Sequence, residues 1–196
     1  MCLLAAMIPA VFSPACSSDD DGPTPEPLTI TLSDIEGNMN GIDRIDLSLG
    51  DIGNHESYQT FRTHTLSSGD IVFELPGNIP SLYLHEFQEL GGVTVSDPNL
   101  RLCSVRFDPK SNTILAGTIY YLYYGVTASY FQYWIWSDRD ATVSGAYSPV
   151  ADYSETYDLD LKHGWNKVIV ELSGAAHYKF RMGEGDGNYS WQILTF

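Results

Sequence analysis

Hydrophobic and polar residues alternate along most of the chain from Leu28 onward. The alternation is clearest in residues 28–33, 44–49, 70–75, 157–162 and 167–172. Successive side chains of a β-strand point to opposite faces, so this pattern gives each strand one apolar and one polar face, as in antiparallel sheets. No stretch shows the i, i+3, i+4 spacing of an amphipathic helix with caps. The pattern therefore predicts an all-β fold with little helix.

Turn-forming residues separate these segments at short intervals. They are Gly50-Asp51, Pro76-Gly77-Asn78, Asp97-Pro98-Asn99, Asp108-Pro109-Lys110, His163-Gly164 and Gly185-Asp186-Gly187-Asn188. Many short strands at this spacing favour an antiparallel β-sandwich over residues 28–196. A division into two stacked β units near residues 108–113 is the alternative. Residues 118–124 are apolar or aromatic on both faces, which predicts a central strand.

The first sixteen residues have a different character. Residues 1–12, MCLLAAMIPAVF, form an apolar run shorter than the roughly 20 residues of a transmembrane helix. The run matches the apolar region of a secretory signal peptide and ends in Ser13-Pro14-Ala15-Cys16. It resembles a bacterial lipoprotein signal, in which the cysteine is lipidated and becomes the new N-terminus. We therefore interpret residues 1–16 as a signal segment with Cys16 as the lipidation site.

Residues 17–27, SSDDDGPTPEP, read as an acidic, proline-rich tether. Pro-rich segments extend by about 3.1 Å per residue, so this stretch reaches about 34 Å from the anchor. Its start, Ser17 to Asp21, resembles the acidic export signal of Bacteroidota surface lipoproteins. The resemblance implies an outer-membrane protein that faces the cell exterior, held on the membrane by its lipid.

Composition narrows the classes of partner. The chain has 10 Lys and Arg against 25 Asp and Glu, a formal net charge of -15, and such a surface repels phosphates, so we expect no nucleic-acid partner. Among the three cysteines, Cys2, Cys16 and Cys103, only Cys103 belongs to the body, so no internal disulfide can form there. Alternation places Cys103 on the apolar face of its strand, and we expect a buried, inert thiol.

No catalytic motif stands out. A nucleophile elbow, a phosphate-binding loop and a C-x-x-C pair are all missing. His85-Glu86 starts like a zinc-protease helix, but Glu89 stands where the second histidine must be. Asp138 and Asp140 supply only part of a calcium loop, so a plain polar turn is favoured. We expect no enzyme, no catalytic residues, no metal and no cofactor.

One strand concentrates aromatic residues and offers a candidate ligand site. Alternation places Gln132, Trp134, Trp136 and Asp138 on a single strand face. If this face is exposed, it forms an aromatic platform beside polar groups that suits sugar rings. The competing interpretation buries both faces between sheets.

The last third of the chain has a recognisable sequence pattern. Residues 133–145, YWIWSDRDATVSG, are followed by residues 156–168, TYDLDLKHGWNKV. Together with the signal region, they resemble small, uncharacterised Bacteroidota surface lipoproteins. The Gly164-Trp165-Asn166 corner is predicted to be a hairpin turn with Trp165 capping the sandwich.

These observations favour a lipid-anchored surface protein with a non-enzymatic role in adhesion, ligand capture or envelope architecture. A glycan-binding surface lipoprotein is one alternative, and its partner would be a glycan. A pilus-type tip or anchor subunit of the fimbrillin kind is another, with a protein partner. Fimbrillins mature by cleavage after a basic residue, and no Lys or Arg lies between Cys16 and Arg44. That absence makes the pilus alternative the weaker one.

Overall fold

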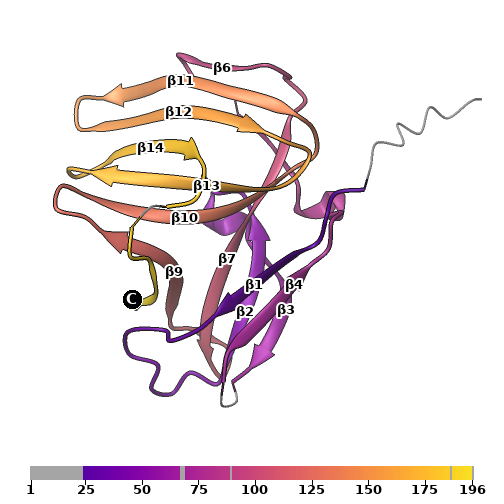
Figure 1. Cartoon of the computed structure of the whole chain (residues 1–196), viewed down its shortest axis with the longest axis vertical. Helices are drawn as coiled ribbons and strands as arrows, with labels where there is room; N and C mark the ends of the chain where they lie inside the picture. The colour runs from indigo at the N-terminus through magenta and orange to yellow at the C-terminus, as the bar shows by residue number, and fades with distance from the viewer. Residues whose placement is uncertain (1–23, 67–68, 89, 186, 196) are drawn as a thin grey trace, which may run out of the picture.

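A computed structural model describes residues 24–66, 69–88, 90–185 and 187–195, and these residues form an all-β fold, as predicted (Figure 1). The strands are β1 (Leu28–Leu32), β2 (Arg44–Gly50), β3 (Gln59–Thr65), β4 (Ile71–Leu75), β5 (His85–Glu86), β6 (Val93–Val95), β7 (Arg101–Ser111), β8 (Ile114–Leu115), β9 (Gly117–Tyr124), β10 (Ala128–Ser137), β11 (Ala141–Val150), β12 (Tyr153–Leu161), β13 (Gly164–Ser173), β14 (His177–Met182) and β15 (Ser190–Thr195). Two single 3-10 turns, η1 (His55–Ser57) and η2 (Ser81–Tyr83), complete the elements. No helix in these ranges has the length and apolar character needed to cross a bilayer.

The strands form one large sheet and one small sheet. Ten strands of the large sheet follow the order β3-β2-β7-β9-β10-β13-β14-β12-β11-β6, while β15 pairs with β9, and β5 and β8 pair with β7. The small sheet is the antiparallel pair β1–β4. Figure 1 shows the large sheet curling from β6 and β11 at one end to β2 and β3 at the other.

Apolar side chains form a separate cluster on each face of the large sheet. One cluster joins Ile30 of β1 and Phe73 of β4 to residues of β2, β7, β9, β10 and β15. The other lies over β10 to β14 and includes residues of the segment 87–102. Strand β10 contributes to both, with Trp134 and Trp136 in the first cluster and Ile135 in the second. This strand is therefore packed on both of its faces.

The alternation predicts several strand faces correctly. Strand β4 alternates between buried and exposed positions along its whole length, and β9 is the predicted central strand, with β10 and β15 as neighbours. Strand β2 differs, because Asp46 and Ser48 on its predicted wet face are buried. Strands β3 and β7 flank β2, and Lys110 of β7 places its Nζ 2.7 Å from Asp46 Oδ2. The long side chains of neighbouring strands thus cover the polar face of β2.

Two buried carboxylates on β2 and β7 have cationic partners. Burial by itself would raise the pKa of Asp46, but hydrogen bonds from Lys110 and Thr63 outweigh it and hold this pKa below the usual range. Asp108 accepts hydrogen bonds from Ser48 Oγ at 2.6 Å and from Arg106 Nε at 2.7 Å. Both carboxylates are therefore satisfied, as buried charges must be.

The order of the last strands departs from a simple meander. Strand β14 lies between β12 and β13 and pairs parallel to β12, whereas all the other strand pairs in the described ranges are antiparallel. The predicted hairpin at Gly164-Trp165-Asn166 is therefore wrong, because β12 and β13 are not paired and the chain turns a corner there. Trp165 is half-buried, and its Nε1 donates to Pro76 O at 2.9 Å. Its indole thus ties β13 to the turn that follows β4.

The predicted turn at Asp108-Pro109-Lys110 is also wrong. These residues lie inside β7, which continues to Ser111, and the chain reverses at Asn112 with a φ of 57°. Pro109 has no N–H to donate, but its carbonyl oxygen still accepts the Ala116 N–H at 2.9 Å, so this position of the strand keeps its acceptor bond. The division considered near residues 108–113 falls on β7 and this reversal, and β7 pairs with β2, β9 and β10, which come from both halves of the chain.

The predicted signal segment, including Cys16, lies outside the described residues, as do residues 17–23 of the tether. Residues 24–27 run along the body. A Cβ on Gly77 would come within 1.7 Å of Pro25 O, and one on Gly164 within 2.6 Å of Pro25 Cβ. Because these two glycines have no side chain, Pro25 packs directly against them. The end of the predicted tether is therefore in contact with the β-sheet body.

Candidate functional site

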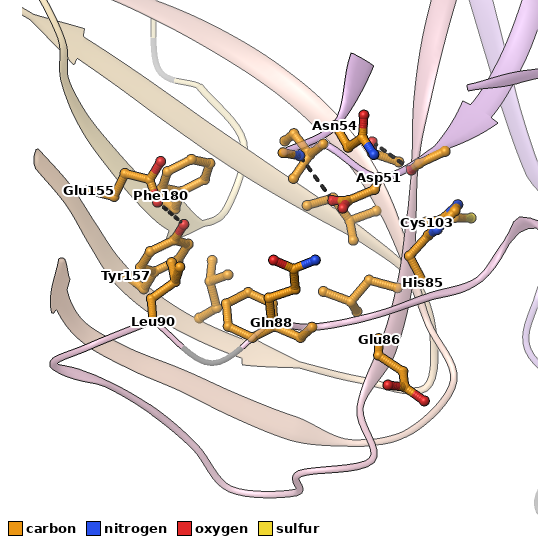
Figure 2. Close-up of a pocket in the computed structure, with 18 residues that line it drawn as sticks. Asp51, Asn54, His85, Glu86, Gln88, Leu90, Cys103, Glu155, Tyr157 and Phe180 are labelled. Carbon is orange, nitrogen blue, oxygen red and sulfur yellow. Dashed lines mark hydrogen bonds between the residues drawn. The ribbon is translucent and has the colours of Figure 1, made fainter. Parts of the chain in front are cut away.

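A pocket of about 430 Å³ lies on the face of the large sheet opposite the β1–β4 pair. Strands β7, β10, β12 and β14 supply Leu102, Ile135, Leu159 and Phe180. The loop after β2 and the segment around β5 form the rest of the wall. These walls contribute Asp51, Ile52, Gly53, Asn54, His85, Glu86, Phe87, Gln88 and Leu90. Figure 2 shows Glu155, Tyr157 and Phe180 at one end and Asp51, Asn54 and His85 at the other.

One end of the pocket is aromatic. The rings of Tyr157 and Phe180 stack with centroids 4.7 Å apart, and Phe87 meets Tyr157 edge-on at 5.9 Å. Glu155 accepts hydrogen bonds from the hydroxyls of Tyr153 and Tyr157. The bond to Glu155 and burial raise the pKa of Tyr153 to about 12, and burial together with Glu155 also raises the pKa of Tyr157. Both phenols therefore stay protonated at neutral pH and hold the carboxylate in place.

The other end brings a cysteine and a histidine to one wall. Cys103 and His85 both line the pocket, the residue types of a thiol hydrolase. The Cys103 side chain is only 1% exposed, however, and burial raises the pKa of its thiol to about 12. A nucleophilic cysteine needs a lowered pKa and access to substrate, so Cys103 is the inert, buried thiol that the alternation predicts.

The imidazole of His85 has one ring nitrogen without a hydrogen-bond partner among the described residues. This atom, Nε2, is buried. A buried polar atom without a partner costs about 1–3 kcal/mol. His85 therefore keeps a buried ring nitrogen without a partner among the described residues, at a residue that lines the pocket.

The predicted sugar platform is wrong. Trp134 and Trp136 are 9% and 4% exposed, and Gln132 is buried as well. The Trp136 Nε1 donates to Gly77 O at 2.7 Å, and Trp134 stacks on Trp191 of β15 at 5.7 Å. The β1–β4 pair and β15 cover this face of β10, so both faces of the strand are in the interior.

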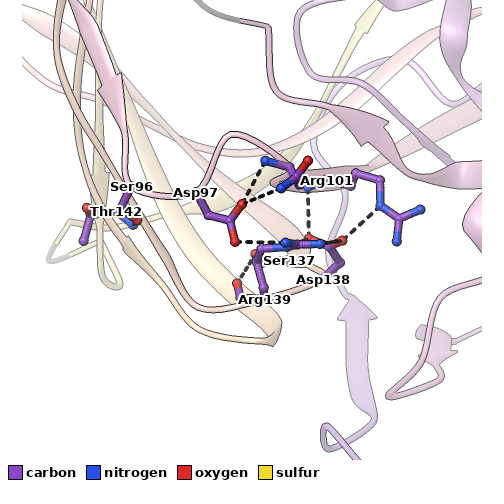
Figure 3. A network of polar contacts seen from close by, with 8 residues as sticks. Ser96, Asp97, Arg101, Ser137, Asp138, Arg139 and Thr142 are labelled. Carbon is purple, nitrogen blue, oxygen red and sulfur yellow. Dashed lines mark hydrogen bonds and ion pairs between the residues drawn. The ribbon is translucent and has the colours of Figure 1, made fainter. Parts of the chain in front are cut away.

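The fourth platform residue, Asp138, connects the β10–β11 turn to the first residue of β7 (Figure 3). Its Oδ1 accepts from the Arg101 amide at 2.9 Å and from Arg139 Nε at 3.0 Å. Its Oδ2 accepts from Arg101 Nε at 3.0 Å and from Arg139 Nη2 at 3.1 Å. Arg139 also reaches Asp97 at 2.9 Å. Four donors occupy the carboxylate, so Asp138 fastens the start of β7 to the β10–β11 turn and is not a ligand group.

Acid should weaken the hydrogen bonds between Asp138 and the two arginines, Arg101 and Arg139, which we call the Asp138 clamp. Burial alone would raise the pKa of Asp138, but the bonds from Arg139 and Arg101 outweigh burial and hold the pKa below its usual range. A lowered folded pKa gives stability that is present above the unfolded value, about 3.9, and is lost as pH falls through the folded pKa. We expect Asp138→Asn to lose about 1–3 kcal/mol at pH 7. Below pH 4 the loss should shrink.

Urea denaturation of both proteins at several pH values measures this difference. Asp158→Asn is the control, because Asp158 lies on the exposed face of β12 and its loss should leave stability nearly unchanged. An Asp138→Asn deficit that is constant from pH 7 to pH 3 contradicts the clamp.

No group of three or more His, Cys, Asp or Glu residues in the described ranges is arranged to hold a metal ion. The pocket residues themselves were not predicted from the sequence. They come from segments between Gly50 and Phe180, and a single sequence carries no signal that brings such distant segments together. The sequence pointed only to the near-motif at His85 and to the apolar face of residues 157–162, which carries Leu159.

Comparisons of the chain with protein-family models, curated proteins and solved structures found no match.

Proposed function

We propose that this is a lipid-anchored surface protein that captures a small ligand in the pocket over β7, β10, β12 and β14, without converting it. The observation that carries the proposal is the pocket itself. It has a volume of about 430 Å³ and a mainly apolar lining, with a few polar groups at its ends. Small-molecule sites in proteins have this size and this distribution of groups.

The lining suggests the chemistry of the ligand. Phe87, Tyr157 and Phe180 offer aromatic contacts for an apolar or aromatic body. The charged side chains of the lining are the carboxylates Asp51, Glu86 and Glu155, and the whole chain has a net charge of -15. Such a site repels anions and favours a neutral or cationic head group.

The thiol and the phenols near the pocket are unsuited to converting a ligand. The pocket's thiol is buried and protonated, and the phenols of Tyr153 and Tyr157 are engaged with Glu155. Acid–base or nucleophilic catalysis needs a group with a pKa near the working pH and within reach of the substrate. These groups instead favour holding a ligand in place.

Binding of two matched probes tests the proposal. We expect 2-phenylethylamine, an aromatic ring with an ammonium group, to bind the pocket and raise the Tm. Phenylacetate, the same ring with a carboxylate, should bind at least about tenfold more weakly. Isothermal titration calorimetry gives both affinities, and equal affinities or no binding of either probe contradicts the proposed chemistry.

A pocket-filling variant locates the binding. Leu90 is half-buried in the wall, so Leu90→Trp should occupy the pocket and weaken the amine by about tenfold or more. The matched control is Leu82→Trp, since Leu82 is 58% exposed and lies outside the pocket lining. Unchanged amine binding by Leu90→Trp would place the probe elsewhere.

The anchor belongs to the same proposal. A lipid on Cys16 and an extended tether would hold the pocket near the membrane, where a captured ligand can be passed on. The support for this part is the sequence of residues 1–27, with its short apolar run, the cysteine and the acidic, proline-rich stretch.

A further inference from the structure

The small sheet leaves one long edge open beside the large one. Strand β1 pairs with β4 along one edge, and it has no other strand partner in the described part of the chain. After β1 the chain crosses to β15, where Glu36 N donates to Trp191 O at 2.7 Å and Ile193 N donates to Glu36 O at 3.0 Å. In the described ranges, the layer over this face of the large sheet thus consists of β1 and β4, and the second edge of β1 is not paired with any strand. An open strand edge presents backbone groups that can pair with another chain.

A groove of about 560 Å³ follows this open edge. Leu28 to Thr31 of β1 form one side, and residues Ser33, Asp34 and Glu36 extend it. The floor is aromatic and contains Tyr121, Trp134, Tyr189 and Trp191.

The rings of the floor form a continuous row. Tyr189 lies 5.3 Å from Tyr121, Tyr121 lies 4.8 Å from Trp191, and Trp191 lies 5.7 Å from Trp134. Trp134 and Trp191 are largely buried, while Tyr121 and Tyr189 are half-buried. The groove therefore combines an unpaired strand edge with aromatic rings in its lining.

Charge distinguishes one end of the groove. Asp34 and Glu36 are exposed, and neither forms an ion pair within the described ranges. The cation of the lining, Lys167, is already paired with Glu184. An occupant with a positive charge at this end would meet two carboxylates that have no cationic partner.

We propose that the groove binds an extended, basic segment of a partner polypeptide, which adds as a strand to the open edge of β1. Backbone hydrogen bonds to β1 provide the pairing, and alternate apolar side chains of the segment rest on the aromatic floor. A Lys or Arg of the segment lies against Asp34 and Glu36. This site is separate from the pocket of the proposed function, since the lining residues of the two do not overlap.

The same charges argue against a second copy of this chain as the occupant. Two copies paired through β1 would bring acidic rims together, and each chain has a net charge of -15. Like charges placed opposite one another destabilise strand pairs. A basic partner meets the opposite condition.

Binding of a synthetic peptide to the full-length protein tests the inference. The probe is the capped heptapeptide Lys-Val-Thr-Val-Thr-Val-Lys, and the control peptide Lys-Val-Pro-Val-Pro-Val-Lys keeps its charge but lacks two backbone donors. We expect only the first to bind in an NMR titration and to slow hydrogen exchange of the β1 amides. Equal binding of both peptides, or binding that leaves the β1 amides unprotected, overturns strand addition.

Variants of Asp34 and Glu36 test the acidic end of the groove. Asp34 and Glu36 are exposed, so the double variant Asp34→Asn/Glu36→Gln should fold normally and bind the first peptide about tenfold more weakly. Asp152→Asn/Asp158→Asn removes two exposed carboxylates away from the groove and should bind as the wild type does. If both double variants weaken peptide binding equally, the effect comes from the net charge of the protein and not from Asp34 and Glu36, and the proposed site is overturned. A β1 edge protected by self-association, shown by sedimentation of a dimer without peptide, overturns it as well.

Discussion

Trp136→Ala is expected to lower the free energy of unfolding by about 3–5 kcal/mol, the cost of truncating a buried tryptophan. The indole is 4% exposed and belongs to the cluster between the β1–β4 pair and the large sheet. Its Nε1 also donates to Gly77 O at 2.7 Å. The substitution therefore opens a cavity and leaves a buried carbonyl without its donor. Small domains are stable by only about 5–15 kcal/mol, so this loss is a large fraction of the whole free energy of unfolding.

Two further variants separate the causes of this loss. Trp136→Phe keeps most of the packing but removes the N–H, so it should cost less than the alanine variant. Tyr124→Ala removes an aromatic ring that is 55% exposed, and its cost should stay within about 0.5 kcal/mol. Urea denaturation followed by far-UV circular dichroism measures all three. A Trp136→Ala protein as stable as the wild type would mean that the ring is on the surface. The interpretation of this strand face as an exposed sugar platform would then be correct.

Cys16→Ala should release the protein from the membrane completely. Each buried CH₂ of an acyl chain contributes about 0.8 kcal/mol, so lipidation by more than one chain makes attachment stable. Without a lipid the acidic body should be found in the soluble fraction, and its intact mass should lack the acyl groups.

Cys2→Ala is the matched control for the anchor. Cys2 lies within the apolar run that precedes the expected cleavage site, so this variant should remain lipidated and membrane-bound. Fractionation after detergent extraction, together with intact-mass measurement, reads out both variants. If Cys16→Ala stays in the membrane fraction with an unchanged mass, the lipoprotein interpretation is wrong.

The sequence predicted the fold class and many strand faces because these are local properties. The alternation of Ile71, Phe73 and Leu75 with polar neighbours is enough to indicate a strand with one buried face, and β4 has that form. Cys103 is buried for the same reason. The error at Pro109 is also instructive, because Asp-Pro favours a turn locally, yet pairing with β2 carries β7 through it.

The candidate pocket could not be predicted from local alternation. Its lining joins Asp51 and Asn54 after β2, His85 in β5 and Glu155 in β12. Each residue looks ordinary in its own segment. The curl of the large sheet and the path of the segment around β5 bring them together, and neither follows from alternation.

The sequence by itself determined that this protein is built from amphipathic strands with an acidic surface, since side-chain period and charge are properties of consecutive residues. The tertiary structure decided which strands are buried on their second face. Trp134 and Trp136 lie in the interior because β1, β4 and β15 cover β10, and Asp46 is buried because its neighbours bring a lysine and an arginine to it. Burial depends on what packs above a face, and those contacts join residues far apart in the chain.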